Sequence, residues 1–64
     1  MPTRILIVDD HPLFRDGLRA LLQRQSDFTV VGEADTVASA VRLAQETQPD
    51  VVLMDLSLPD GGGV

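Results

Sequence analysis

The chain has 64 residues and a formal net charge of −5, with ten acidic residues against five basic ones and no cysteine. A domain of about 60 residues buries only about 60% of the surface that its unfolded chain exposes, so its stability is marginal. The lack of cysteine excludes disulfides and thiolate metal sites, and the acidic charge favours a cation over direct binding to nucleic acid. With no signal peptide and no apolar run of about 18 residues, we expect a cytoplasmic chain that does not enter the membrane.

Apolar strand patterns and amphipathic helix patterns alternate along the sequence. Residues 4–9 show no polar alternation, which predicts a strand covered on both faces, as in a parallel sheet. Helical spacing of apolar residues predicts a helix over 12–25. Residues 28–34 predict a second strand with a polar end that suits a sheet edge. A second helix over 36–47 and a third, fully apolar strand over 50–55 complete the series.

Several residues predict how the helices begin and pack. Pro12 suits the first turn of a helix because its ring fixes φ and it has no N–H to satisfy. Asp35 or Thr36 can cap the second helix. Gly17 is costly inside a helix, so we expect it to allow close packing on the sheet. Both aromatic side chains are expected in the core: Phe14 and Phe28.

The β-α-β-α-β order with short connections predicts an α/β fold with a parallel sheet and right-handed crossovers. If the first strand lies between the other two, the strand order is 2-1-3, and the first and third strands are neighbours about 4.8 Å apart. Their carboxyl ends then bring Asp9, Asp10 and Asp55 to one edge of the sheet, although 45 residues separate the last two. Open α/β sheets bind ligands at such an edge.

Three crowded carboxylates predict a bound cation, because without one their pKa values must rise. A ligand set made of oxygen alone favours Mg²⁺. Asp55 stands alone at its strand end, which suits a carboxylate that attacks phosphorus and forms an acyl phosphate. Asp9 and Asp10 would then hold the metal, and the backbone carbonyl of Ser57 could add a further ligand.

Two stretches, ILIVDDHPLFRDGLRALL and PDVVLMDLSLPDGGGV, resemble the receiver domain of bacterial two-component response regulators, in particular the NarL/LuxR-type subgroup. The resemblance implies a flavodoxin-like (CheY-like) parallel sheet, here truncated to strand order 2-1-3. It also implies a phosphorelay in which Asp55 accepts a phosphoryl group from a sensor histidine kinase. Asp9, Asp10 and the Ser57 carbonyl then complete the Mg²⁺ site.

By this resemblance, residues 1–64 match the N-terminal half of a receiver domain, with no second domain. The family's Thr or Ser after the fourth strand and Lys after the fifth have no counterpart in the 64 residues, and Gly62 stands where many members carry Asp. We therefore expect a signalling domain that is not an enzyme and is inactive as an isolated fragment. DNA binding is expected only from a C-terminal helix-turn-helix, which the sequence lacks.

Two other functions compete with this interpretation. A haloacid-dehalogenase-like phosphatase also uses an Asp nucleophile, but it needs an acid two positions later, where Ser57 stands. A half-domain that folds by self-association is the other, since the apolar third strand would be an unprotected edge. That geometry predicts a homo-oligomer through the third strand.

Individual residues also have simpler structural explanations. Asp9 and Asp10 alone could be a turn and a helix cap, and His11 is expected as an exposed residue at the helix entry rather than as a ligand. Arg15 and Arg19 are expected on a solvated face, with kinase docking as the alternative. Residues 61–63 are all glycine, but they lack the spacing of a phosphate-binding loop.

Overall fold

The computed structural model describes residues 2–55. Ser57, Gly62 and the glycine run therefore lie outside the described residues. The predicted β-α-β-α-β order is confirmed, and the element boundaries differ from the predicted ones by at most two residues. The elements are β1 (Thr3–Val8), α1 (Pro12–Gln23), β2 (Phe28–Ala34), α2 (Val37–Thr47) and β3 (Val51–Met54).

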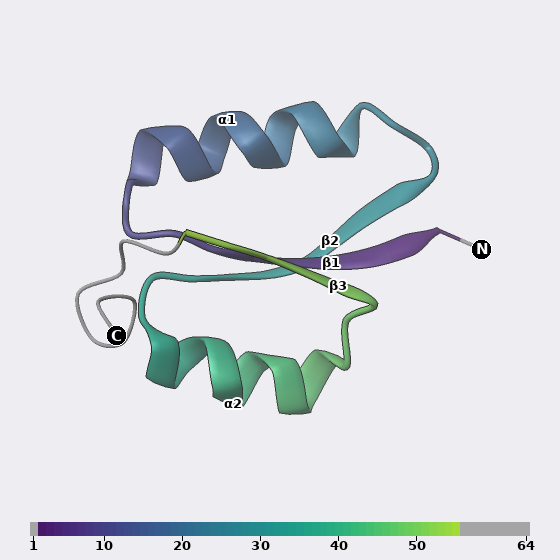
Figure 1. Ribbon diagram of the computed structural model, residues 1–64. Helices are drawn as coiled ribbons and strands as arrows, with labels where there is room; N and C mark the ends of the chain where they lie inside the picture. Colours follow the sequence, from purple (N-terminus) through teal and green to yellow (C-terminus); the bar gives the residue numbers. More distant parts are fainter. Residues whose placement is uncertain (1, 56–64) are drawn as a thin grey trace.

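The three strands form one parallel sheet in the order β2-β1-β3, as predicted for a flavodoxin-like fold. Figure 1 shows α1 on one face of this sheet and α2 on the other. Along the chain, α1 connects β1 to β2 and α2 connects β2 to β3. The two connections run over opposite faces of the sheet, and β1 lies in the middle of it. The central strand therefore pairs with both neighbours.

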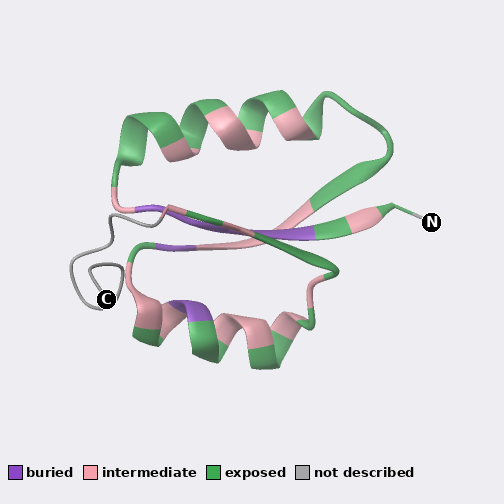
Figure 2. Ribbon diagram, in the orientation of Figure 1, coloured by how far each residue is buried: buried purple, intermediate pink, exposed green. Residues whose placement is uncertain are grey.

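The core is built around β1, which is buried along most of its length (Figure 2). Leu6 and Val8 pack with Ala34 of β2 and Ala40 of α2. Because side chains alternate along a strand, the other buried residues of β1 face α1. This double coverage explains why residues 4–9 lack polar alternation.

A register shift in β2 decides which way its polar end points. Ile5 pairs with Val30, but Leu6 pairs with Gly32, so β2 carries one extra residue at this point. Downstream of the bulge Glu33 pairs with Ile7 and lies on the α1 face. Without the bulge Glu33 would pair with Val8 and face the apolar packing against α2.

The ends of the helices follow the predicted local chemistry. Pro12 occupies the first turn of α1. Thr36, not Asp35, caps α2, and its hydroxyl accepts a hydrogen bond from the Ser39 N–H in a reciprocal capping box. Gln48 ends α2 with a left-handed φ of 49°. Within residues 2–55 neither helix is long and apolar enough to cross a membrane.

The predicted burial of the aromatic residues is wrong. Leu13 and Phe14 are 88% and 61% exposed, and Phe28 at the start of β2 is also exposed. In the described part of the chain α1 packs over β2 and β1 and does not cover β3. Gly17 does not serve close packing either, because an added Cβ would meet nothing within 4 Å among the described residues.

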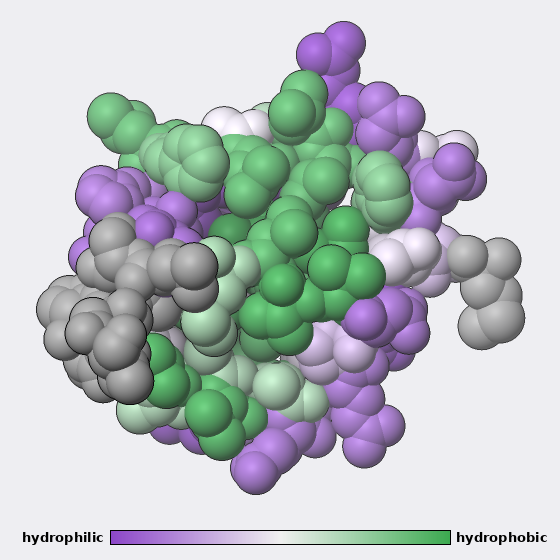
Figure 3. Space-filling view, viewed as in Figure 1, coloured by the Kyte–Doolittle hydropathy of each residue, from purple (hydrophilic) through white to green (hydrophobic). Residues whose placement is uncertain are grey.

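The third strand is likewise uncovered, since α2 also packs over β2 and β1. Val51, Val52 and Met54 are exposed despite their apolar side chains. Figure 3 shows the result as a continuous apolar surface that runs from α1 across the front of the sheet. Hydrophobic patterning thus identifies the apolar faces correctly, but only part of that apolar surface is buried.

Truncation of Leu6 should test this distribution of burial. Leu6 is 0% exposed, so Leu6→Ala should destabilise the fold by about 2–5 kcal/mol, enough to unfold a marginal domain. Leu13→Ala removes the same atoms from an exposed site and should change the free energy of unfolding by less than about 0.5 kcal/mol. Chemical denaturation followed by circular dichroism measures both, and equal losses would contradict the described core.

Candidate functional site

Backbone hydrogen bonds to β1 and β2 place the two strand-end aspartates at the same edge of the sheet. The N–H of Asp9 donates to the carbonyl of Ala34 at 2.9 Å, and the N–H of Asp55 donates to the carbonyl of Val8 at 2.9 Å. Both residues thus continue the strand pairing by one position. Their side chains start from neighbouring points because the backbone of β1 fixes them both.

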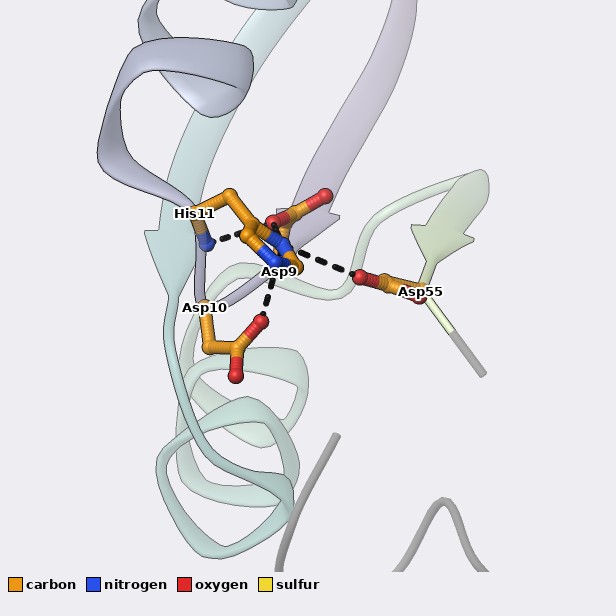
Figure 4. Close-up of side chains that lie close together, drawn as sticks. All are labelled: Asp9, Asp10, His11 and Asp55. Atoms are coloured by element: carbon orange, nitrogen blue, oxygen red, sulfur yellow. Dashed lines mark hydrogen bonds and ion pairs between the residues drawn. The ribbon is translucent and has the colours of Figure 1, made fainter. Parts of the chain in front are cut away.

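Four side chains meet at this edge (Figure 4). Each of Asp9, Asp10, His11 and Asp55 offers a possible ligand atom, and these atoms all lie within 4.8 Å of one another. The structure therefore brings together the three aspartates predicted from the sequence. It also adds a histidine that the sequence analysis placed outside the site.

The imidazole of His11 reaches into the cluster even though its side chain is 63% exposed. Its Nδ1 lies 3.0 Å from Asp9 Oδ1, 3.0 Å from Asp10 Oδ1 and 3.4 Å from Asp55 Oδ2. The predicted exposure of His11 is confirmed, but its Nδ1 also lies within 3.4 Å of all three carboxylates. Its position directly after two site aspartates was the available sequence signal.

The carboxylate of Asp9 is the most deeply placed of the three, with its side chain only 5% exposed. Its Oδ1 accepts hydrogen bonds from the backbone N–H of His11 at 2.6 Å and from the imidazole Nδ1 at 3.0 Å. These donors satisfy a buried charge that would otherwise be costly. The first turn after β1 is thereby fixed around Asp9.

Asp10 presents a different situation. Its Oδ1 is buried and has no hydrogen-bond partner in the described part of the chain, because the nearby imidazole nitrogen does not meet hydrogen-bond geometry. A buried carboxylate oxygen without a donor is unfavourable unless a positive charge lies close by. This oxygen is therefore suited to a cation.

The carboxylates raise the pKa of His11 above its ordinary value of 6.5. The hydrogen bond to Asp9 is the largest cause, followed by the negative charge of Asp10, and desolvation opposes both. The acidic cluster therefore favours the positively charged form of the imidazole.

Arg15 of α1 braces the site from outside. Its Nη1 donates to the backbone carbonyl of Asp9 at 2.8 Å, and its Nε lies 3.2 Å from Glu33 Oε1. Arg19 Nη1 donates to the other oxygen of Glu33 at 2.9 Å. The prediction of a solvated face is thus wrong for Arg15. This residue links α1 to the site through the Asp9 carbonyl and to β2 through Glu33.

The family of the chain follows from its sequence as well as from this site. Residues 5–64 match the response regulator receiver domain family. The match covers nearly the whole chain, and the fold and the acidic edge agree with it. The chain belongs to the receiver domain family of response regulators.

Individual relatives support the NarL/LuxR-type subgroup. The chain is 46% identical over 61 residues to the transcriptional regulatory protein YdfI of Bacillus subtilis, with 95% of the chain and 29% of that protein covered. It is 41% identical over 63 residues to the nitrate/nitrite response regulator NarL of Escherichia coli, with 98% of the chain and 29% of that protein covered. The chain thus spans about three tenths of the length of these relatives.

Solved structures agree with the fold. A LuxR-family response regulator from Aurantimonas superposes with a TM-score of 0.90 at 49% identity, covering 98% of the chain and 45% of that structure. The receiver domain of a NarL-type regulator from Mycobacterium tuberculosis gives a TM-score of 0.86 at 43% identity, covering 91% and 47%. The β2-β1-β3 arrangement is therefore that of receiver domains.

Proposed function

We propose that the chain is a phosphoacceptor segment of two-component signalling, in which Asp55 receives a phosphoryl group from a sensor histidine kinase. The observation that supports this most is the convergence of Asp9, Asp10 and Asp55 from two neighbouring strand ends. Membership of the receiver family supports the same chemistry. In this proposal the chain is a cytoplasmic signalling component and not an enzyme.

The residues present fit a magnesium ion. Asp9, Asp10 and Asp55 provide carboxylate oxygens, and the Ser57 carbonyl, outside the described residues, is proposed as a further ligand. Mg²⁺ prefers oxygen ligands and accepts one or two carboxylates together with water and phosphate. The buried, unpartnered oxygen of Asp10 supports the fit. When bound, Mg²⁺ would offset the charge of an incoming phosphoryl group.

The three carboxylates have different environments, which supports different roles. The Asp9 side chain is only 5% exposed, so it is suited to holding a cation rather than to attacking a substrate. Asp55 projects from the end of β3, where its backbone is fixed by Val8. A carboxylate held at a strand end can approach phosphorus in line with a leaving group.

The transfer proposed for Asp55 is a displacement at phosphorus. One carboxylate oxygen of Asp55 forms a bond to the phosphorus atom, and the bond from phosphorus to the donor group breaks. The donor leaves with the electron pair of that bond, and Asp55 becomes an acyl phosphate. A phosphatase function is less favoured, because Ser57 stands where such enzymes place their acid.

The output of the signalling protein is proposed from its relatives. Several of these relatives are named as transcriptional regulatory proteins. Because the chain covers about three tenths of their length, DNA binding is assigned to the rest of such proteins, through a C-terminal helix-turn-helix. The net charge of −5 supports no direct nucleic-acid contact by this segment.

We also propose that the chain self-associates through β3. This strand is at the edge of the sheet, and its backbone N–H and C=O groups on one side offer a template for a second strand. Val52 and Met54 add exposed apolar side chains on one face of that edge. A second copy would bury both the edge and the apolar surface next to it.

Removal of a site carboxylate should weaken Mg²⁺ binding. We expect Asp10→Asn and Asp55→Asn each to weaken binding by at least about tenfold in a calorimetric titration, because each loses an anionic ligand. Asp16→Asn is the matched control, since it removes the same charge from an exposed position on α1. Unchanged binding in both site variants would remove the metal from the proposal.

Acetyl phosphate should label Asp55 to only a low level in this chain, because the family's Lys and its Thr or Ser have no counterpart in the 64 residues. Incubation of the full chain with acetyl phosphate and Mg²⁺, followed by borohydride reduction and peptide mass spectrometry, should locate the modification at residue 55. Asp55→Asn should abolish the label, while Asp16→Asn should keep it. A label on another aspartate, or one that survives Asp55→Asn, would contradict the assignment of the acceptor.

A lysine on the edge strand should disrupt self-association. Sedimentation velocity at tens of micromolar should show a dimer or larger species for the unmodified chain. Val52→Lys should shift it to the monomer, because a charge on an edge strand opposes pairing. Val41→Lys, at an exposed apolar position on α2, is the control and should leave the assembly intact. A compact, folded monomer before mutation would refute the interface.

A further inference from the structure

The imidazole nitrogen of His11 lies among the oxygens that a cation would use. Its Nδ1 is 3.0 Å from Asp9 Oδ1, 3.0 Å from Asp10 Oδ1 and 3.4 Å from Asp55 Oδ2. In Figure 4 the ring is drawn over the cluster, with dashed lines to all three carboxylates. One side chain thus contacts every acidic group proposed to bind the metal.

We propose that His11 competes with the divalent cation for these carboxylate oxygens and thereby sets the magnesium affinity of the site. The inference rests on the function proposed for the acidic cluster and concerns how that cluster is regulated. In this arrangement the ring occupies the cluster when no cation is bound. The ring must move away before Asp9 and Asp10 can coordinate Mg²⁺.

The hydrogen bonds of Asp9 explain why the ring and a cation would compete. Its Oδ1 accepts both the His11 backbone N–H and the imidazole Nδ1, at 2.6 and 3.0 Å. A carboxylate oxygen has about two lone-pair directions, so these two donors leave little capacity for a metal. The backbone donor is fixed by the turn, whereas the ring can rotate. The ring is therefore the donor that a cation displaces.

The ligand preference of Mg²⁺ explains why His11 would not itself bind the metal. Mg²⁺ is a hard cation that takes oxygen ligands at about 2.0–2.1 Å, and imidazole suits Zn²⁺, Ni²⁺ and Cu²⁺ better. A nitrogen that donates a hydrogen to Asp9 has no lone pair to offer a metal. His11 is therefore expected to oppose Mg²⁺ binding rather than to complete its coordination.

The exposure of the ring matters because a competing side chain needs somewhere to go. The His11 side chain is 63% exposed, and within residues 2–55 it makes no capping hydrogen bond at the start of α1. Rotation toward solvent thus costs few other contacts. The same feature means that replacing His11 should leave α1 in place.

Calorimetric titration of MgCl₂ into the full chain tests the inference. We expect His11→Ala and His11→Gln to bind Mg²⁺ about 3- to 10-fold more tightly than the unmodified chain, as removal of one competing hydrogen bond predicts. Gln45→Ala, an exposed residue on α2, is the control and should keep the original affinity. Equal affinity in both His11 variants would overturn the inference, and weaker affinity would make His11 a ligand instead.

A second measurement does not depend on the variants folding. In the unmodified chain, MgCl₂ should shift the His11 ring ¹⁵N resonances toward those of a solvent-exposed imidazole, and Asp10→Asn should suppress this shift. Resonances that keep their metal-free values while Mg²⁺ binds would overturn the inference and leave the proposed metal site intact. If Mg²⁺ binds to neither the unmodified chain nor the His11 variants, the proposed metal site itself fails.

Discussion

The site depends on the central position of β1. Because β1 pairs with both other strands, its last residues fix the backbone on either side: Asp9 joins the β2 ladder and Asp55 joins β1. In a parallel sheet the carboxyl ends of all strands lie at the same edge. Two carboxylates distant in sequence therefore meet because β1 and β3 are parallel neighbours, and an order that placed another strand between them would separate the carboxylates.

This arrangement has an electrostatic cost that the surrounding residues only partly offset. Burial of a carboxylate is unfavourable unless donors or a positive charge compensate. Asp9 receives two donors from His11, while the buried oxygen of Asp10 receives none among the described residues. The backbone of this turn is held by Arg15, whose own charge is directed toward Glu33. The charges of Arg15 and Glu33 beside the site thus compensate each other, whereas the carboxylates of the site are only partly compensated. The acidic cluster therefore still favours a cation.

The helices and the apolar strands that end in aspartate could be predicted from local patterns, whereas the strand order 2-1-3, which brings those aspartates together, was implied by the resemblance to receiver domains. Apolar runs that end in aspartate specify a parallel sheet with its charges at one edge. The position of the His11 ring could be predicted only in part, from its place directly after Asp9 and Asp10, because its Nδ1 also lies 3.4 Å from Asp55, which is 44 residues away. The pairing of Glu33 with Arg15 was hidden, since a one-residue bulge determines the face on which Glu33 lies.

The exposure of Phe14 shows a further limit of hydrophobic patterning. Periodicity identifies the apolar side of a helix, but burial requires a surface on which that side can pack. In the described chain α1 lies over β2 and β1, so its outer apolar residues and those of β3 remain open to solvent. Leu13 and Phe14 of α1 and Leu53 and Met54 of β3 line an open groove with a volume of about 930 Å³.

This groove shares its lining with the acidic cluster, because Asp9, His11 and Asp55 form one end of it and Phe14 and Met54 line its apolar part. Anything that covers the apolar part therefore also removes water from the carboxylates. Lower solvation strengthens the attraction of those carboxylates for a cation, since electrostatic interactions grow as the local dielectric falls. The apolar surface beside the site therefore influences the electrostatics of the carboxylates.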